Sequence, residues 1–145
     1  MKALIQRVKK AEVSVNKKII GKINHGLLVF LGVHKNDTEN NVKKLTKKIS
    51  NLRIFSDKND KMNLSIKDTN GEILIISQFT LYGECKKGNR PSFIESAPPE
   101  LAKNLYKNFI NHLKKENIKI ETGKFRANMQ IDSINDGPIS LIIEI

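Results

Sequence analysis

The chain has 145 residues, a formal net charge of +11, 39% hydrophobic residues and a single cysteine, Cys85. This length predicts one domain over residues 1–145, and one cysteine excludes an internal disulfide framework and a multi-cysteine metal site. No apolar run approaches the roughly 20 residues of a membrane helix, and residues 1–7 lack a signal-peptide pattern, so we expect a cytoplasmic protein without a membrane partner.

The positive charge has two explanations. A basic surface favours nucleic acid as a partner. However, lysine supplies 22 of the 26 positive charges, and Lys, Asn and Ile together make up 58 of the 145 residues. Such a bias is expected from an A/T-rich genome, so the charge by itself leaves both explanations open.

Short apolar runs in the first half of the chain predict strands at 2–8, 11–15, 19–23, 27–33 and 53–56. Lys9-Lys10 separates the first two, and Lys17-Lys18 is the predicted tip of a hairpin. The run from 27 to 33 is apolar on both faces, which is typical of a central strand.

Two segments have helical periodicity. The first begins at Asp37 or Thr38, both good N-cap residues, and places apolar side chains at 42, 45, 49 and 52 on one face. The second begins at Pro98-Pro99-Glu100 and repeats an apolar residue every four positions as far as Leu113.

The strongest predicted strand runs from Glu72 to Leu81, and three more follow at 118–122, 128–134 and 139–145. Asn135-Asp136-Gly137-Pro138 is the predicted turn between the last two. Because strands outnumber helices and short turns join neighbours, we predict an α/β (α+β) fold. Its mostly antiparallel sheet would roll into a barrel-like core with two covering helices.

Chemistry could lie at Ser77-Gln78-Phe79-Thr80-Leu81, which follows the aliphatic run 73–76. In an extended strand, Gln78 and Thr80 would project from one face, and Ser77 and Phe79 from the other. Hydroxyls, an amide and free backbone N–H groups at a strand end are the components of an oxyanion site. The alternative is an edge strand whose hydroxyls only cap the sheet, and spacing alone favours that alternative.

Other reactive residues give weaker signals. The histidines His25, His34 and His112 are isolated, and Cys85 has no partner histidine, so neither a nucleophile–base pair nor a metal site is predicted. Gly137-Pro138 is a dipeptide in which a cis bond costs only about 0.5–1 kcal/mol. A cis bond there would direct the flanking carbonyls with no side chain in the way.

Six separated motifs, in order and in register over the whole chain, resemble the D-aminoacyl-tRNA deacylase (D-tyrosyl-tRNA(Tyr) deacylase) family. They are Leu4–Val8, Gly26–Val29, Arg53–Asp57, Ser77–Leu81, Arg90–Phe93 and Asn135–Pro138. The resemblance implies a homodimer of barrel-like subunits with no metal or organic cofactor. Such an enzyme cleaves the ester between a D-amino acid, or glycine, and the 3′-terminal adenosine of tRNA, and it rejects L-aminoacyl-tRNA.

The resemblance also assigns residues. It makes Ser77, Gln78, Phe79 and Thr80 the catalytic pocket wall. Gly137 and Pro138 become a chirality filter that enters the partner subunit's active site, with Arg7 steadying that turn and Phe125 and Met129 binding substrate. Arg126 departs from the family, which has a small residue after this phenylalanine. The cations of the loop after residue 83, namely Lys86, Lys87 and Arg90, are the predicted RNA contacts.

An aminoacyl ester is already reactive, and the ribose 2′-OH of the substrate lies next to it. We therefore expect substrate-assisted chemistry with backbone oxyanion stabilisation and no titrating side chain. Two alternatives remain: an esterase that uses Thr80 as its nucleophile, and a non-catalytic basic module that binds tRNA ends.

Overall fold

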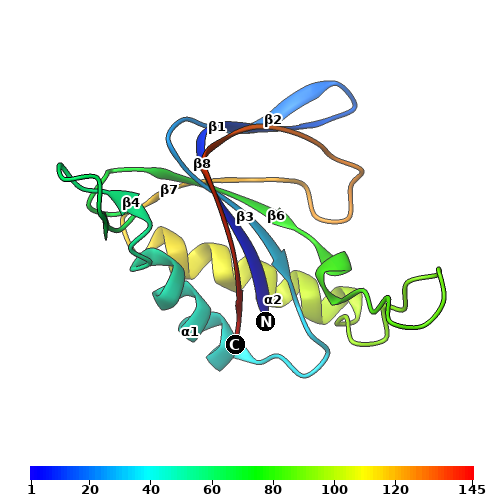
Figure 1. The fold of residues 1–145 in the computed structure, drawn as a ribbon. Coiled ribbons are helices and arrows are strands. Elements are labelled where there is room, and N and C mark those ends of the chain that lie inside the picture. Colours follow the sequence, from blue (N-terminus) through cyan, green and yellow to red (C-terminus); the bar gives the residue numbers. More distant parts are fainter.

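The computed structural model describes residues 1–145, with a curved sheet above and two helices side by side beneath it (Figure 1). The main sheet contains β1 (Lys2–Val15), β2 (Lys18–Ile23), β3 (Gly26–Gly32), β6 (Glu72–Ser77), β7 (Lys119–Thr122) and β8 (Gln130–Glu144). The helices are α1 (Glu39–Ser50) and α2 (Pro99–Lys114), and β4 (Phe55–Ser56) pairs with β5 (Met62–Leu64). Neither helix is long and apolar enough to cross a membrane.

The main sheet has the order β2-β1-β3-β6-β7, with β8 also paired to β1. The three pairings of β1 are antiparallel, whereas β3–β6 and β6–β7 are parallel. The sheet curls until β2 meets β7: a Cβ added to Gly21 would lie 3.0 Å from the carbonyl oxygen of Thr122. The predicted barrel-like core with two covering helices is therefore confirmed.

The hydrophobic core lies between the concave face of the sheet and the helices. Ile5, Val29 and Ile75 from the strands meet Leu45 and Phe109 from the helices, and all five are fully buried. Each such side chain contributes roughly 1.5–3 kcal/mol of burial free energy. Thr38 caps α1 as predicted, and the apolar stripes of both helices face this core.

The prediction of two strands at the N-terminus is wrong, because β1 continues through Lys9-Lys10. Both lysines are exposed and the ladder with β8 is irregular there, but β8 pairs with β1 on both sides of the irregularity. A long partner strand thus overrides the local polar break.

The predicted turn at Asn135–Pro138 does not separate two strands. β8 is continuous, and its ladder with β1 resumes on both sides of this segment: Val8 pairs with Asn135 and Gln6 with Ser140. Only Arg7 lies between the two β1 residues, whereas 136–139 lie between the two β8 residues. The extra residues form a bulge opposite Arg7.

The predicted strand from Glu72 to Leu81 ends early, at Ser77. The Gln78 N–H donates to the Leu31 carbonyl at 2.8 Å, and after it residues Phe79–Tyr82 form a 3-10 turn. Hydrogen bonds within the turn, such as Gly83 N–H to Thr80 carbonyl at 2.9 Å, replace the ladder. The predicted alternation of side chains beyond Ser77 is therefore wrong.

Candidate active site

A cavity of about 530 Å³ lies where β3 and β6 end, between the start of α2 and the segment that leads into β8. Pockets of this size, mostly apolar with a few polar groups, are typical ligand sites. The walls come from four parts of the chain and consist of Leu31, Val33, Ile76, Ser77, Gln78, Phe79, Ser96, Ala97, Pro99, Ala102, Tyr106, Phe125, Arg126, Ala127, Asn128, Met129 and Ile131.

Five residues predicted as site residues line this one cavity: Ser77, Gln78, Phe79, Phe125 and Met129. The first three come from the end of β6 and the 3-10 turn, and the other two from the loop before β8. The fold thus brings together two motifs that are almost 50 residues apart in the chain.

The wall formed by α2 was not predicted. Pro99, Ala102 and Tyr106 face the cavity, one step around the helix from the core stripe. The Tyr106 hydroxyl donates to the Ile75 carbonyl at 2.9 Å, and its ring packs against that of Phe125 with centroids 5.7 Å apart. The i, i+3, i+7 spacing of these residues was the available sequence signal.

The cavity contains almost no titrating groups. Its lining has no His, Cys, Asp, Glu or Lys, and the ionisable side chains in it are Tyr106 and the permanently charged Arg126. Burial raises the pKa of Tyr106, so its hydroxyl stays protonated and serves as a donor. The remaining polar groups are the hydroxyls of Ser77 and Ser96 and the amides of Gln78 and Asn128. This chain therefore offers hydrogen bonds and shape to a ligand, but no general base.

Thr80 lies outside this lining. Its hydroxyl oxygen accepts a hydrogen bond from the Gln78 side-chain amide. No histidine or carboxylate is among its hydrogen-bond partners, so nothing in the chain activates it as a nucleophile.

Arg7, Gly137 and Pro138 are also outside the cavity of their own chain. The Gly137–Pro138 peptide bond is cis, and Gly137 has φ +119°. Arg7 is almost fully buried, and its Nη1 donates to the Ile54 carbonyl at 2.6 Å. The β8 bulge thus presents Gly137 and Pro138 on the molecular surface, where both are exposed.

The loop from Gly83 to Pro98 carries Lys86, Lys87 and Arg90, all exposed and none lining the cavity. The outer part of the loop is closed by an isolated bridge between Glu84 and Ser92. These three cations therefore lie on an extension beside the site rather than within it.

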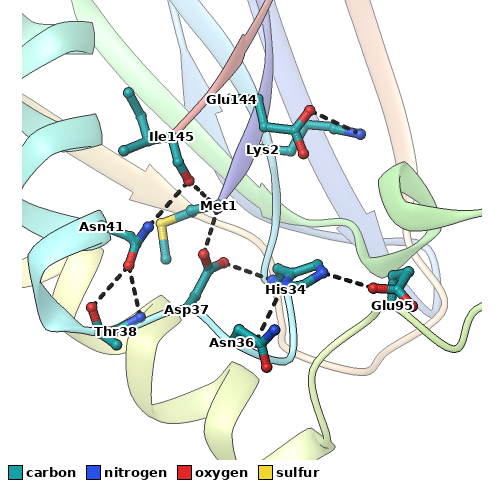
Figure 2. Close-up of polar contacts among 10 residues, drawn as sticks. All are labelled: Met1, Lys2, His34, Asn36, Asp37, Thr38, Asn41, Glu95, Glu144 and Ile145. Atoms are coloured by element: carbon teal, nitrogen blue, oxygen red, sulfur yellow. Dashed lines mark hydrogen bonds and ion pairs between the residues drawn. The ribbon is translucent and has the colours of Figure 1, made fainter.

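Figure 2 shows how the base of this loop is fixed. The Glu95 carboxylate lies 2.9 Å from Nε2 of His34, the contact drawn in Figure 2. It also lies 2.9 Å from Nζ of Lys35. Because Nδ1 of His34 accepts the Asn36 N–H at 3.1 Å, Nε2 carries the proton and donates to Glu95. Hydrogen bonds from Lys35 and His34 lower the pKa of Glu95.

The same network reaches the chain termini (Figure 2). The backbone N–H of His34 donates to Asp37 at 2.7 Å, and Asp37 also binds the Met1 ammonium at 2.6 Å. Met1 in turn donates to the Ile145 carbonyl at 2.7 Å. A buried ion pair thus supports the segment that holds the loop.

Comparisons with known proteins agree along the whole chain. Residues 4–144 match the protein family described as D-Tyr-tRNA(Tyr) deacylase. The D-aminoacyl-tRNA deacylase of Thermosipho africanus is 58% identical over 144 residues, which cover 99% of this chain and 97% of that protein. The D-aminoacyl-tRNA deacylase of Fusobacterium nucleatum is 55% identical over 144 residues, covering 99% and 95%.

Two solved structures share the fold. That of a c-Myc DNA unwinding element binding protein superposes with a TM-score of 0.93 at 40% identity, covering 100% of this chain and 99% of that chain. That of a probable eukaryotic D-amino acid tRNA deacylase has a TM-score of 0.85 at 17% identity, covering 99% and 98%. At the lower identity the likeness extends to the fold alone.

Proposed function

Since this chain belongs to the D-Tyr-tRNA(Tyr) deacylase family, we propose that it hydrolyses the ester bond of D-aminoacyl-tRNA. The products are the free D-amino acid and the tRNA, and L-aminoacyl-tRNA is left intact. The observation that carries the proposal is the cavity walled by Ser77, Gln78 and Phe79, which has room for a small acyl group and contains no general base. Because tRNA is charged in the cytoplasm, the reaction belongs there.

The mechanism relies on position rather than on a titrating residue. The cavity holds the aminoacyl ester, and the first N–H groups of the 3-10 turn at Phe79 have no partner inside that turn. These groups and the polar side chains of Ser77 and Gln78 stabilise the oxyanion as it forms. Water attacks the carbonyl carbon, either directly or after a first attack by the adjacent 2′-OH has moved the acyl group to that oxygen. The C–O ester bond then breaks, the ribose oxygen takes up the proton that the water loses, and the free D-amino acid leaves. Because the attacking oxygen is held next to the ester, its effective concentration is high, and this takes the place of activation by a general base.

The chirality filter comes from a second copy of the chain. Gly137 and Pro138 lie outside the cavity of their own chain, which fits a role in the partner's site. β8 pairs on one edge only, and several of its apolar side chains are exposed, including Ile134 (48%) and Ile142 (67%). A free strand edge with an apolar face is suited to pairing with another chain. We therefore propose a homodimer whose two sites are each completed by the other subunit.

Rejection by a backbone turn also determines which substrates are cleaved. The feature that L-amino acids share is the position of Cβ, so a rigid turn that clashes with it excludes them all, whatever their side chains. Glycine has no Cβ and passes the same filter. Glycyl-tRNA is therefore a proposed second substrate.

The tRNA itself binds through charge. Lys86, Lys87 and Arg90 project from the anchored loop beside the cavity, and Arg126 stands on its wall. Cations around an otherwise uncharged pocket attract a phosphate backbone and leave the pocket free for the ester.

Incubation with D-Tyr-tRNA, L-Tyr-tRNA and glycyl-tRNA tests this function. Cleavage of the D and glycyl substrates with L-Tyr-tRNA spared is the expected result, and equal rates on the two enantiomers would refute it. Saturable binding of tRNA without turnover would favour a non-catalytic tRNA-end-binding module. Covalent labelling of Thr80 by an acylating reagent, with hydrolysis of simple aminoacyl esters, would favour a Thr80 esterase.

A further inference from the structure

Two aromatic rings stand exposed at the edge of the cavity. Phe79 and Phe93 meet edge to face, with centroids 5.0 Å apart and an interplanar angle of 64°. Phe79 is 57% exposed and Phe93 38% exposed, and the neighbouring Ile94 is 75% exposed. Large apolar side chains are rarely left in water as a group unless they contact a partner.

The pair is held rigidly. The Ser96 hydroxyl donates to the Phe79 carbonyl at 3.0 Å, which ties the loop of Phe93 to the 3-10 turn of Phe79. At the base of the loop, the backbone of Ser96 pairs with that of His34, and the Ala97 N–H donates to the Val33 carbonyl at 2.9 Å. The contact of Glu95 with His34 (Figure 2) and its contact with Lys35 fix the same segment. The rings are thus positioned before any ligand arrives.

The two rings differ in their relation to the site. Phe79 lines the cavity, whereas Phe93 lies outside the lining and contacts the ring of Phe79. Beyond Phe93 the loop carries Lys86, Lys87 and Arg90. A path from the cavity across Phe93 to these cations therefore passes from a pocket to an aromatic surface and then to positive charge.

We propose that Phe93, supported by Phe79, is a stacking surface for the unpaired bases that precede the terminal adenosine of tRNA. This inference rests on the proposed function, which places the aminoacyl-adenosine in the cavity. The nucleotides attached to it must leave past the cavity edge. Aromatic rings beside a basic strip are how proteins bind single-stranded nucleic acid, since every base has a face that can stack.

Phe93→Ala tests the proposal through a ratio of two substrates. D-Tyr-tRNA carries the preceding nucleotides, whereas D-tyrosyl-adenosine does not. For the wild type we expect a lower KM for the tRNA than for the nucleoside. In Phe93→Ala the ratio between these two KM values is expected to fall about ten-fold, the scale of one base–aromatic stack. Phe93→Tyr keeps a stacking ring and is expected to retain the advantage.

Met62→Ala is the matched control. Met62 is also an exposed apolar side chain (56%), but it lies in β5, whose partner β4 is on the opposite side of the molecule from the 3-10 turn (Figure 1). The ratio of its KM values for D-Tyr-tRNA and D-tyrosyl-adenosine should equal that of the wild type. An unchanged ratio in Phe93→Ala would overturn the proposal, as would an equal loss on both substrates, which would mean that Phe93 only supports the pocket.

Two further measurements keep the outcomes distinct. Sedimentation of Phe93→Ala shows whether this surface contacts a protein: a changed oligomeric state would overturn the RNA assignment. Binding of uncharged tRNA, with the bases that precede its terminal adenosine either intact or removed to leave abasic nucleotides, needs no turnover. If the wild type binds the intact end more tightly and Phe93→Ala loses that preference, the stacking proposal is supported even if the protein does not deacylate tRNA. If Phe93→Ala keeps the preference, the inference fails while the proposed function is untouched.

Discussion

Arg7 holds Asp136 in two ways. Its Nε donates to the Asp136 main-chain carbonyl at 3.3 Å and lies 3.1 Å from the carboxylate oxygen Oδ2. Because Arg7 is almost fully buried in β1, the residue that precedes Gly137 is fixed to the interior of the sheet. The exposed Gly137-Pro138 bulge therefore projects from a rigid base, which suits the steric filter proposed for it.

Gly137→Ala should weaken the rejection of L-substrates. An added Cβ would lie 3.0 Å from Cγ1 of Ile139 and 3.2 Å from Nη2 of Arg7, at a φ of +119°. A side chain in such a conformation costs about 1–3 kcal/mol, so the turn shifts. Initial rates on D- and L-Tyr-tRNA should show a smaller D-to-L ratio. Gly88→Ala is the control, since Gly88 also has a positive φ but no neighbour within 4 Å, and its ratio should not move.

Mixed dimers should show which subunit supplies the turn. Ala102→Phe fills the cavity that Ala102 lines and should inactivate its own pocket. When these chains exchange with Gly137→Ala chains, the only open pocket of a mixed dimer receives an intact turn if the turn acts across the dimer. L-Tyr-tRNA cleavage should then fall with added Ala102→Phe chains while D-Tyr-tRNA cleavage persists. If subunit exchange is confirmed and the rate of L-Tyr-tRNA cleavage per open pocket does not change, the turn acts in the site of the subunit that carries it.

Thr80→Ala should retain measurable turnover, because Thr80 lies outside the cavity lining and has no activating base. A D-aminoacyl-tRNA that ends in 2′-deoxyadenosine should react poorly if the neighbouring hydroxyl assists. Acid-quenched samples analysed by mass spectrometry should contain no acyl-enzyme. A dead variant together with an acyl-enzyme formed from the deoxy substrate would establish Thr80 as the nucleophile.

Removing loop charge should weaken the salt dependence of tRNA binding. Each single-strand phosphate that the protein no longer neutralises reduces the slope of log affinity against log salt by about 0.7. Lys86→Ala combined with Lys87→Ala should therefore bind tRNA more weakly and with a shallower slope. Lys58→Ala combined with Lys61→Ala removes equal charge from the exposed turn between β4 and β5 and should leave the slope as it is. Identical slopes for both double variants would mean that the loop does not touch RNA.

The Glu72 carboxylate should make stability fall in acid. Its pKa is held below the ordinary value of 4.5, chiefly by the hydrogen bond from Lys119 at 2.7 Å. The native protein thus binds this proton less readily than the unfolded chain, so the stabilisation is present above pH 4.5 and is lost as the pH falls through the native pKa. In urea unfolding, Glu72→Gln should lose less stability than the wild type when the pH is lowered from neutral to well below 4.5. Parallel losses would contradict this.

The local sequence determined those helices and strands that can be recognised from the residue pattern of the element itself. The four-residue periodicity of Leu105, Phe109 and Leu113 places one face of α2 in the core without reference to any partner. Thr38 is the N-cap of α1, where its N–H and hydroxyl both donate to the side chain of nearby Asn41. The uninterrupted apolar run of β6 likewise predicts a buried strand. The motifs also placed Ser77, Gln78, Phe79, Phe125 and Met129, which share one cavity.

Tertiary structure decided the features that depend on a distant partner. β1 and β8 each run through a local break because the other strand pairs with them on both sides of it, and β6 ends at Ser77 because its pairing with β3 ends there. The parallel pairing of β3, β6 and β7, and the cavity wall formed by Ala102 and Tyr106, arise from packing between segments far apart in the chain. No local propensity encodes them, since a strand's neighbours and a pocket's opposite wall are chosen by the burial of shared apolar surface.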